Sequence, residues 1–208
     1  MARAGISRST RWARSCSSER GFSLIEVLVA TGMLAVVSLG VAQMFALATA
    51  KNLAAKGQVS TTMLATQKME QLRGLIFAYD ASGLGLPVTD SSSNLSKCTP
   101  DTSGHGLNPA PTDVLERDTA GFVDYLDGQG NCLDMSSTAN PAPPAGTVYT
   151  RRWAIWPLPT NPNNTLILEV VVTPTAKETI RAQAHDPTGR TRLVEDSMLV
   201  SVLTRKAP

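Results

Sequence analysis

The chain has 208 residues, of which 42% are hydrophobic and 17% are charged, and its formal net charge is +2. This length fits one ordinary domain with appendages. A mean hydropathy of −0.03 argues against several membrane spans, and the low net charge argues against a dedicated nucleic-acid-binding protein, which is usually strongly basic.

The basic residues are concentrated at the start of the chain. Residues 1–21 contain five arginines and one glutamate, a net charge of +4, which leaves −2 for the rest. Such a basic stretch before an apolar one is typical of a leader that directs export.

A long apolar segment follows the leader. The 29 residues from Phe22 to Ala50 include no Lys or Arg and a single acid, Glu26. As a helix this segment would be about 43 Å long, more than the roughly 30 Å core of a bilayer. Because the basic residues flank one side only, we expect a single span of the inner membrane, with a cytoplasmic N-terminus and everything after Ala50 exported.

Three kinds of N-terminal signal have a basic stretch followed by an apolar one. The apolar run is about twice as long as the 7–15 residues of a secretory signal, and Cys16 lies on the wrong side of it for a lipoprotein signal. A plain signal anchor fits the length but leaves Glu26 unexplained, since a charge at the centre of a spanning helix costs about 2.5–3.5 kcal/mol. Cleavage after Gly21 would create an α-amine on Phe22, one helical turn from Glu26, and the carboxylate could pair with that amine or with a neighbouring subunit's.

The segment GFSLIEVLVA, residues 21–30, resembles the type IV pilin family, which includes the pseudopilins of type II secretion. The resemblance implies that prepilin peptidase cuts after Gly21 and N-methylates Phe22. It also implies that Glu26 contacts the N-terminal amine of an adjacent subunit in a filament of pilins or pseudopilins. An unpaired charge in the apolar filament core is costly, so Glu26 would set the register between subunits. A simple signal anchor is the alternative.

After Ala50 the pattern becomes amphipathic without a helix breaker. Apolar residues recur at helical spacing at Ala54, Ala65, Met69, Leu72, Ile76 and Tyr79. The charged side chains, Lys68 and Glu70 among them, are expected elsewhere on the surface. We therefore predict one helix over residues 22–79, whose second part, residues 51–79, is the spine of the exported domain.

Two features within this helix refine the resemblance. LATQKMEQLRGL, residues 64–75, is similar to a stretch in minor pilins of the pilus-modification (PilV) branch and in the related minor pseudopilin I. Major pilins usually have a proline where this chain has Gln43. Both features favour a minor subunit over the main fibre protein.

Residues 80–146 are predicted to form a variable loop region, because 41 of the 67 are Gly, Pro, Ser, Thr, Asn or Asp. Cys98 and Cys132 lie within it. Removal of Cys16 with the leader leaves this even pair in an oxidising compartment, which predicts a disulfide. On the chain-entropy model it would contribute roughly 3–4 kcal/mol of stability.

Residues 147–208 are predicted to form an antiparallel sheet, with strands at 149–156, 165–173 and 197–204 and a turn at 158–164. The expected fold class is therefore α+β and pilin-like. A long N-terminal helix, transmembrane in its first half, would pack on a C-terminal antiparallel sheet, with the disulfide-closed loop region between them.

No group of residues in the sequence predicts a catalytic or metal site. His105 and His185 lack neighbouring ligands, and Ser91–Ser93 lack an activating base. Four oxygen-bearing residues, Asp124, Asp127, Asn131 and Asp134, lie close together, but their spacing differs from that of a calcium loop and favours a turn. We therefore expect no enzyme activity, no cofactor and no small-molecule substrate.

A basic patch is the one feature that could point to nucleic acid. It would comprise Arg151, Arg152, Arg190, Arg192, Arg205 and Lys206. Such a patch could contact phosphates in a DNA-uptake pilin. The net charge of −2 after the leader instead favours ordinary solvated positions.

Together these features predict a minor pilin-like structural subunit that primes or decorates a type IV pilus. It would start in the inner membrane and end in a periplasmic or extracellular filament. A minor pseudopilin of a type II secretion system is the closest alternative. A membrane-anchored module that binds a surface through residues 80–146 is a further one.

Overall fold

The computed structural model describes residues 21–99, 101–134, 141–178 and 195–206. Over these ranges it contains one long helix, α1 (Leu24–Gly74), a 3-10 turn, η1 (Thr175–Lys177), and seven strands. The strands are β1 (Phe77–Tyr79), β2 (Pro87–Thr89), β3 (Val123–Leu126), β4 (Cys132–Leu133), β5 (Tyr149–Pro157), β6 (Thr165–Pro174) and β7 (Ser197–Thr204). The chain divides within α1 into two units, Met1–Ala48 and Thr49–Pro208, and each is described by itself.

The described part of the first unit is the start of α1. Every residue from Gly21 to Ala50 is exposed. Alanine, leucine and valine dominate this segment; alanine and leucine form helices readily, and no proline interrupts the run. Its apolar residues are therefore exposed along the described part of the unit.

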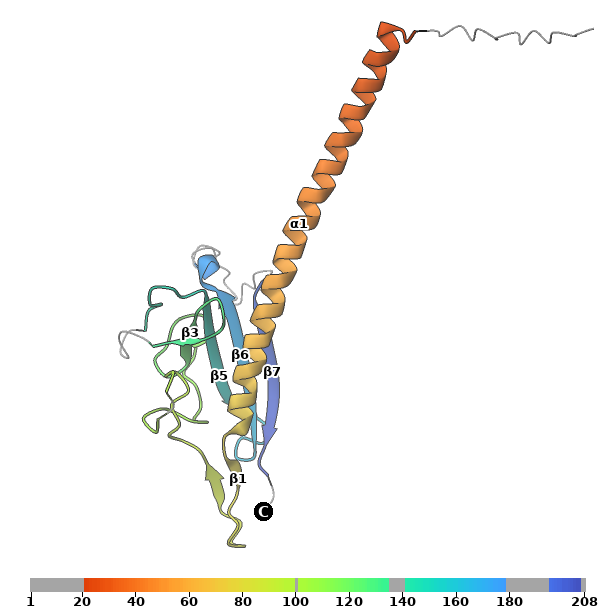
Figure 1. The fold of residues 1–208 in the computed structure, drawn as a ribbon. Coiled ribbons are helices and arrows are strands. Elements are labelled where there is room, and N and C mark those ends of the chain that lie inside the picture. The colour runs from red at the N-terminus through yellow and green to blue at the C-terminus, as the bar shows by residue number, and fades with distance from the viewer. Residues whose placement is uncertain (1–20, 100, 135–140, 179–194, 207–208) are drawn as a thin grey trace, which may run out of the picture. The chain divides into compact units, whose positions relative to one another are not determined.

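The second unit is a helix packed on an antiparallel sheet (Figure 1). The five strands lie in the order β4-β3-β5-β6-β7, and the part of α1 from Thr49 onward crosses one face. Ala65, Met69 and Leu72 of the helix are buried in one cluster with Trp153 and Leu168 of the sheet. This arrangement confirms the predicted α+β fold class.

The register of the three long strands places the core on one sheet face. Trp153 of β5 is opposite Val170 of β6, which is opposite Leu199 of β7. Alternate side chains along a strand point to opposite faces, so these three residues face the same way. The β-branched run of β6 is buried almost throughout because it is the strand between β5 and β7.

The predicted helix end at Tyr79 is wrong, because α1 ends at Gly74. The amide of Leu75 still bonds to the carbonyl of Leu72 at 3.3 Å, and the chain then enters β1. β1 pairs with β2, placing Phe77 opposite Thr89. Gly74 weakens the helix, and the aromatic residues Phe77 and Tyr79 favour a strand. Pairing with β2 then stabilises the extended conformation of residues 77–79.

The loop prediction for residues 80–146 is also only partly right, since β2, β3 and β4 lie within it. All four residues of β3 are buried, and β3 pairs with β5 on one side and β4 on the other. A strand of four residues is too short to show a hydrophobic period, so its pairing depends on neighbours distant in sequence. The expected disulfide joins Cys98 to Cys132, whose Cα atoms are 5.3 Å apart.

Candidate functional site

The predicted cleavage junction lies just before α1. Gly21 and Phe22 are outside the helix, and the Phe22 side chain is 83% exposed. Apart from Gly21 itself and its two chain neighbours, no described residue has a heavy atom within 4 Å of the position that a Cβ on Gly21 would occupy. An enzyme could therefore reach this peptide bond without local unfolding. Residues 1–20 of the predicted leader lie outside the described residues.

Glu26 lies in the first turn of α1. The backbone amides of Glu26 and Val27 both donate to the carbonyl of Ser23, at 3.0 and 3.1 Å, which starts the helix. A carboxylate in the first turn interacts favourably with the positive end of the helix dipole. Within the described residues Glu26 forms no ion pair, so its charge is available to a cation from elsewhere.

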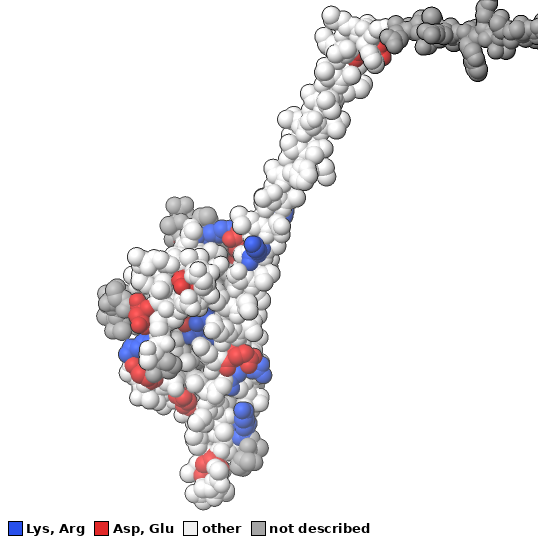
Figure 2. Space-filling model, in the orientation of Figure 1, with Lys and Arg blue, Asp and Glu red and all other residues white. Residues whose placement is uncertain are grey.

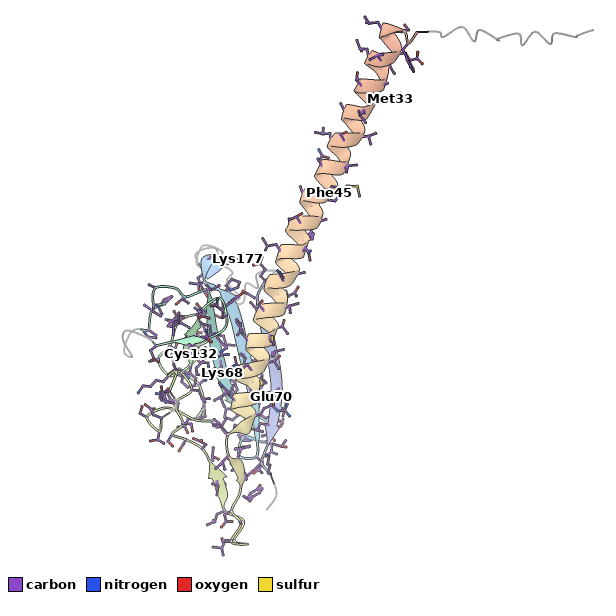
Figure 3. The ribbon with its side chains drawn as sticks, viewed as in Figure 1. Met33, Phe45, Lys68, Glu70, Cys132 and Lys177 are labelled. Atoms are coloured by element: carbon purple, nitrogen blue, oxygen red, sulfur yellow. A yellow bond between two sulfur atoms is a disulfide. The ribbon has the colours of Figure 1, made fainter. Side chains whose placement is uncertain are left out.

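The first part of α1 presents a predominantly apolar surface. The space-filling view shows almost no charged atoms along it apart from one acidic group (Figure 2). Met33, which is 67% exposed, projects away from the helix (Figure 3). In the described part of the chain, α1 is the one helix that is long and apolar enough to cross a membrane.

A buried charge cluster, Lys68, Asp124 and Arg151, joins α1 to the sheet in the second unit. The Nζ atom of Lys68 lies 2.6 Å from Oδ2 of Asp124, and Arg151 forms two hydrogen bonds with the same carboxylate, at 2.8 and 2.9 Å. Lys68 also donates to the carbonyl of Leu95 at 2.7 Å and lies over the Trp153 ring at 4.1 Å. All three charged side chains are nearly inaccessible to water.

The electrostatics of this cluster are asymmetric because Asp124 has two cationic partners while Lys68 shares its one carboxylate with Arg151. Burial lowers the pKa of Lys68 from 10.5 to about 8, and Asp124 only partly offsets this effect. Burial alone would raise the pKa of Asp124, but Lys68 and Arg151 together hold that pKa below its usual range. The carboxylate therefore stays ionised, and Lys68 is the member that loses its proton first.

Arg152 forms a second cluster on the opposite face of β5. It donates to Asp118 at 2.6 and 2.8 Å and to Glu178 at 2.8 Å. Tyr125 donates its hydroxyl to the same Asp118 at 2.7 Å, and burial together with this bond raises the pKa of Tyr125. The guanidinium of Arg152 is therefore buried and paired with two carboxylates, so it is not part of an exposed basic surface.

The structure corrects two predictions about charged residues. Lys68 is buried instead of lying on the surface, and Arg151 and Arg152, expected at ordinary solvated positions, are buried in ion pairs. Arg190 and Arg192, two of the other residues considered for a basic patch, lie outside the described residues. The spacing contained a signal for Lys68, which follows Ala65 by three residues and precedes Leu72 by four, on the core face of the helix.

The side chains of Asp124, Asp127, Asn131 and Asp134 do not converge on a common cation site. Asp124 faces the core, whereas Asp127 accepts the amides of Gln129 and Asn131 at 2.8 and 2.9 Å, which is the geometry of a turn. Asp134 accepts the amide of Cys98 at 3.1 Å. It also lies close to both cysteines, but their sulfurs are joined to each other as a disulfide.

Of the two histidines, only His105 lies within the described residues. His105 is exposed and stacks on Phe122, with ring centroids 5.2 Å apart. Its environment is that of a surface side chain supported by an aromatic neighbour. His185 lies outside the described residues.

Comparison with known proteins bears on the N-terminal site. The family model of the prokaryotic N-terminal methylation motif matches residues 16–42, which include Gly21, Phe22 and Glu26. No curated protein and no solved structure matches the chain. The motif supports a type IV pilin-like family, and it implies processing by prepilin peptidase and assembly with other pilins in a membrane-associated filament.

Proposed function

We propose that this chain is a minor pilin-like structural subunit, made as a precursor and incorporated into a type IV pilus through α1. Prepilin peptidase cuts after Gly21 and methylates the new N-terminus at Phe22. Glu26 then pairs with the N-terminal amine of a neighbouring subunit. The observation that carries this proposal is the methylation motif at the start of α1, whose first part, up to Ala50, is exposed and mostly apolar.

The exposed helix explains why incorporation would be favourable. An apolar helix leaves a bilayer only if another apolar environment receives it, and a bundle of such helices provides one. Beyond the neighbouring backbone of α1 itself, no described residue has a heavy atom within 4 Å of a Cβ built on Gly32 or Gly40. These positions therefore leave room for a neighbouring backbone to approach closely.

Mass spectrometry of the purified protein tests the processing step. We expect an N-terminal peptide that begins at Phe22 and carries one methyl group. Gly21→Val should leave the leader attached, because the bulkier side chain blocks cleavage, whereas Gly5→Val should be processed normally. An unmethylated or differently cut N-terminus in the unaltered chain would contradict the proposal.

A pilus and a secretion pseudopilus would use the same processing and assembly chemistry. The resemblance of residues 64–75 extends to both kinds of minor subunit, while Gln43 supports a minor subunit in either system. Deletion of the gene should abolish surface pili in the first case and block the export of secreted proteins in the second. We propose the pilus as the first candidate and the pseudopilus as the second.

The proposed role is structural instead of catalytic. The most deeply buried charged groups, Lys68, Asp124 and Arg151, satisfy one another and hold α1 to the sheet. They support the fold of the exported unit and leave no unpaired acid or base among themselves.

A further inference from the structure

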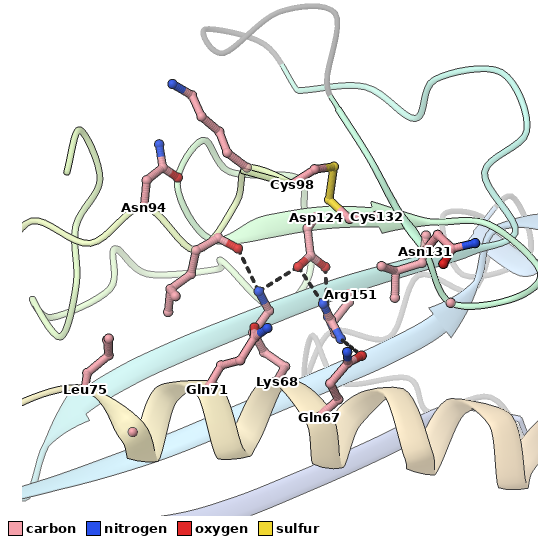
Figure 4. Close-up of a pocket in the computed structure, with 15 residues that line it drawn as sticks. Gln67, Lys68, Gln71, Leu75, Asn94, Cys98, Asp124, Asn131, Cys132 and Arg151 are labelled. Carbon is pink, nitrogen blue, oxygen red and sulfur yellow. Dashed lines mark hydrogen bonds and ion pairs between the residues drawn. A yellow bond between two sulfur atoms is a disulfide. The ribbon is translucent and has the colours of Figure 1, made fainter. Parts of the chain in front are cut away.

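The Cys98–Cys132 disulfide lies beside the buried charge cluster of the second unit (Figure 4). Both cysteines and Lys68 line one pocket of about 680 Å³ between the last turns of α1 and the loop of residues 94–101, here called the Leu95 loop. Both cysteines are partly exposed, so the disulfide is not sealed in the core. The same pocket gives water a path toward Lys68 once the groups that cover this residue move.

The disulfide connects the two elements that provide acceptors for the ammonium group of Lys68. One acceptor is the carbonyl of Leu95 at 2.7 Å, three residues before Cys98 in the loop. The other is Asp124 of β3 at 2.6 Å, and β3 pairs with β4, which carries Cys132. The bond between the sulfurs therefore closes a ring of contacts that runs from Lys68 through the loop and β4 to β3 and back.

Few other bonds hold the Leu95 loop to the rest of the second unit. In the described part of the chain, its hydrogen bonds beyond residues 90–108 run to Lys68 and to Asp134, which accepts the amide of Cys98 at 3.1 Å. Leu95 also packs against the core, but it is only partly buried. β4 has two residues, and so short a pairing is weak by itself. The disulfide is therefore the strongest connection between the loop and the sheet.

Reduction of the disulfide removes the covalent part of this ring. A dithiol supplies two electrons and two protons and itself becomes a disulfide, while Cys98 and Cys132 become separate thiols. The loop can then move away from β4 together with the carbonyl of Leu95. This movement leaves one hydrogen of the Lys68 ammonium group without an acceptor, which is costly in the core and favours contact with water in the pocket.

We propose that the Cys98–Cys132 disulfide is a redox switch for Lys68: when oxidised it keeps the Leu95 loop over this residue, and when reduced it releases the loop and exposes the amine while the sheet remains folded. The sheet does not depend on the bond, because the core between α1 and the long strands contains neither cysteine. Cytoplasmic dithiols keep cysteines reduced, and oxidising compartments join them. The switch therefore closes after export, a timing that rests on the proposed function, whereas the switch itself does not.

Amine labelling of the purified full chain in detergent micelles tests the switch. The protein is treated with an acetyl N-hydroxysuccinimide ester, with and without a phosphine reductant, and peptide mass spectrometry gives the labelling rate at each lysine. We expect Lys68 to react about tenfold or more faster after reduction, since a buried amine reacts only when its site opens locally. Lys56, which is exposed on α1, should react equally in both states. An unchanged rate at Lys68 would overturn the proposal.

Hydrogen exchange at the amide of Val170 separates local opening from unfolding. This residue is fully buried in β6, the strand between β5 and β7, so its amide should stay protected in the reduced protein. Loss of protection at Val170 together with labelling of Lys68 would show that the disulfide holds the whole unit, which contradicts a local switch.

Two variants show whether the covalent bond is what holds the loop. The double variant Cys98→Ser and Cys132→Ser should label Lys68 without reductant as fast as the reduced parent does. Lys97→Gln keeps the disulfide and removes a partly exposed ion pair with Asp101 in the same loop, so its Lys68 should stay protected. Equally fast labelling of Lys68 in Lys97→Gln and in the double variant would refute the role of the disulfide.

Discussion

At the scale of single residues, Lys68 shows how a charge is kept in a core. Its ammonium group has an acceptor in the Leu95 carbonyl, a counter-ion in Asp124 and a ring face in Trp153. A buried ion pair of this kind stabilises a fold little compared with apolar packing, but removal of one partner leaves the other charge uncompensated. We therefore expect the cluster to contribute little net stability and mainly to fix the position of α1 on the sheet, because only one placement pairs Lys68 with Asp124.

The lowered pKa of Lys68 predicts a pH dependence of stability. In the unfolded chain the residue should titrate near 10.5, and in the fold near 8. Between these values the unfolded state binds more protons, so the free energy of unfolding should rise with pH from about 8 to 10, by up to about 1.4 kcal/mol per pH unit. Urea unfolding followed by tryptophan fluorescence measures this slope.

Lys68→Met is the control for this titration, because it removes the ionisable group and keeps a long side chain. The difference in slope between the two proteins isolates Lys68 from every other group. The range ends near pH 10 because the raised pKa of Tyr125 acts in the opposite direction above it. Identical slopes for both proteins would show that Lys68 titrates alike in the folded and unfolded states.

At the scale of elements, the end of the chain fastens the β1–β2 hairpin to the rest of the second unit. The amide of Lys206 donates to Phe77, and the amide of Tyr79 donates back to Lys206, at 3.0 and 3.1 Å. Arg205 lies over the Phe77 ring at 4.1 Å and donates to the carbonyls of Ala78 and Asn163. One side chain thus connects the hairpin to the turn before β6.

Arg205→Ala should loosen this hairpin, because it removes the contact with the Phe77 ring and leaves carbonyls without their donor. We expect a local loss of about 1–3 kcal/mol, seen as faster hydrogen exchange at the Tyr79 amide. Arg73→Ala is the comparison, since its pair with Glu70 is exposed and should be worth less than about 1 kcal/mol. Unchanged exchange at Tyr79 in Arg205→Ala would refute the fastening role.

At the scale of the whole molecule, α1 has two different environments along its length. From Leu24 to Ala50 it is exposed and mostly apolar, and one face of its later turns is buried against the sheet of the second unit. A surface of this kind is unfavourable in water and is typical of a segment that meets a membrane or another protein. The first part of α1 is therefore the part that we propose mediates assembly, whereas the second part packs on the sheet of the second unit.

Glu26→Ala tests the assembly function of the first part. The variant should insert into the membrane and be cleaved, but it should be absent from sheared filaments, because the pairing that sets the register is lost. Glu70→Ala changes an exposed acid on the later part of the same helix and should be incorporated normally. Immunoblots of filament and membrane fractions distinguish the two, and normal incorporation of Glu26→Ala would refute the register role.

Features that depend on local pattern are predictable from the amino-acid sequence. The apolar tract after Gly21, the single acid within it and the three long strands each appear as continuous runs, so composition and period were enough to predict them. The fold class followed, because a long helix and an antiparallel sheet have few ways to bury their apolar faces.

Only the tertiary structure decided the features that depend on residues distant in sequence. Residues 123–126 lie in a segment whose composition predicts a loop, but they form a strand because they pair with β5. This strand lies beside α1, which brings Asp124 within 2.6 Å of Lys68. The same approach converts Arg151 from an expected surface cation into a buried partner. The physical reason is that burial and charge pairing are properties of spatial neighbours, which a local period does not encode.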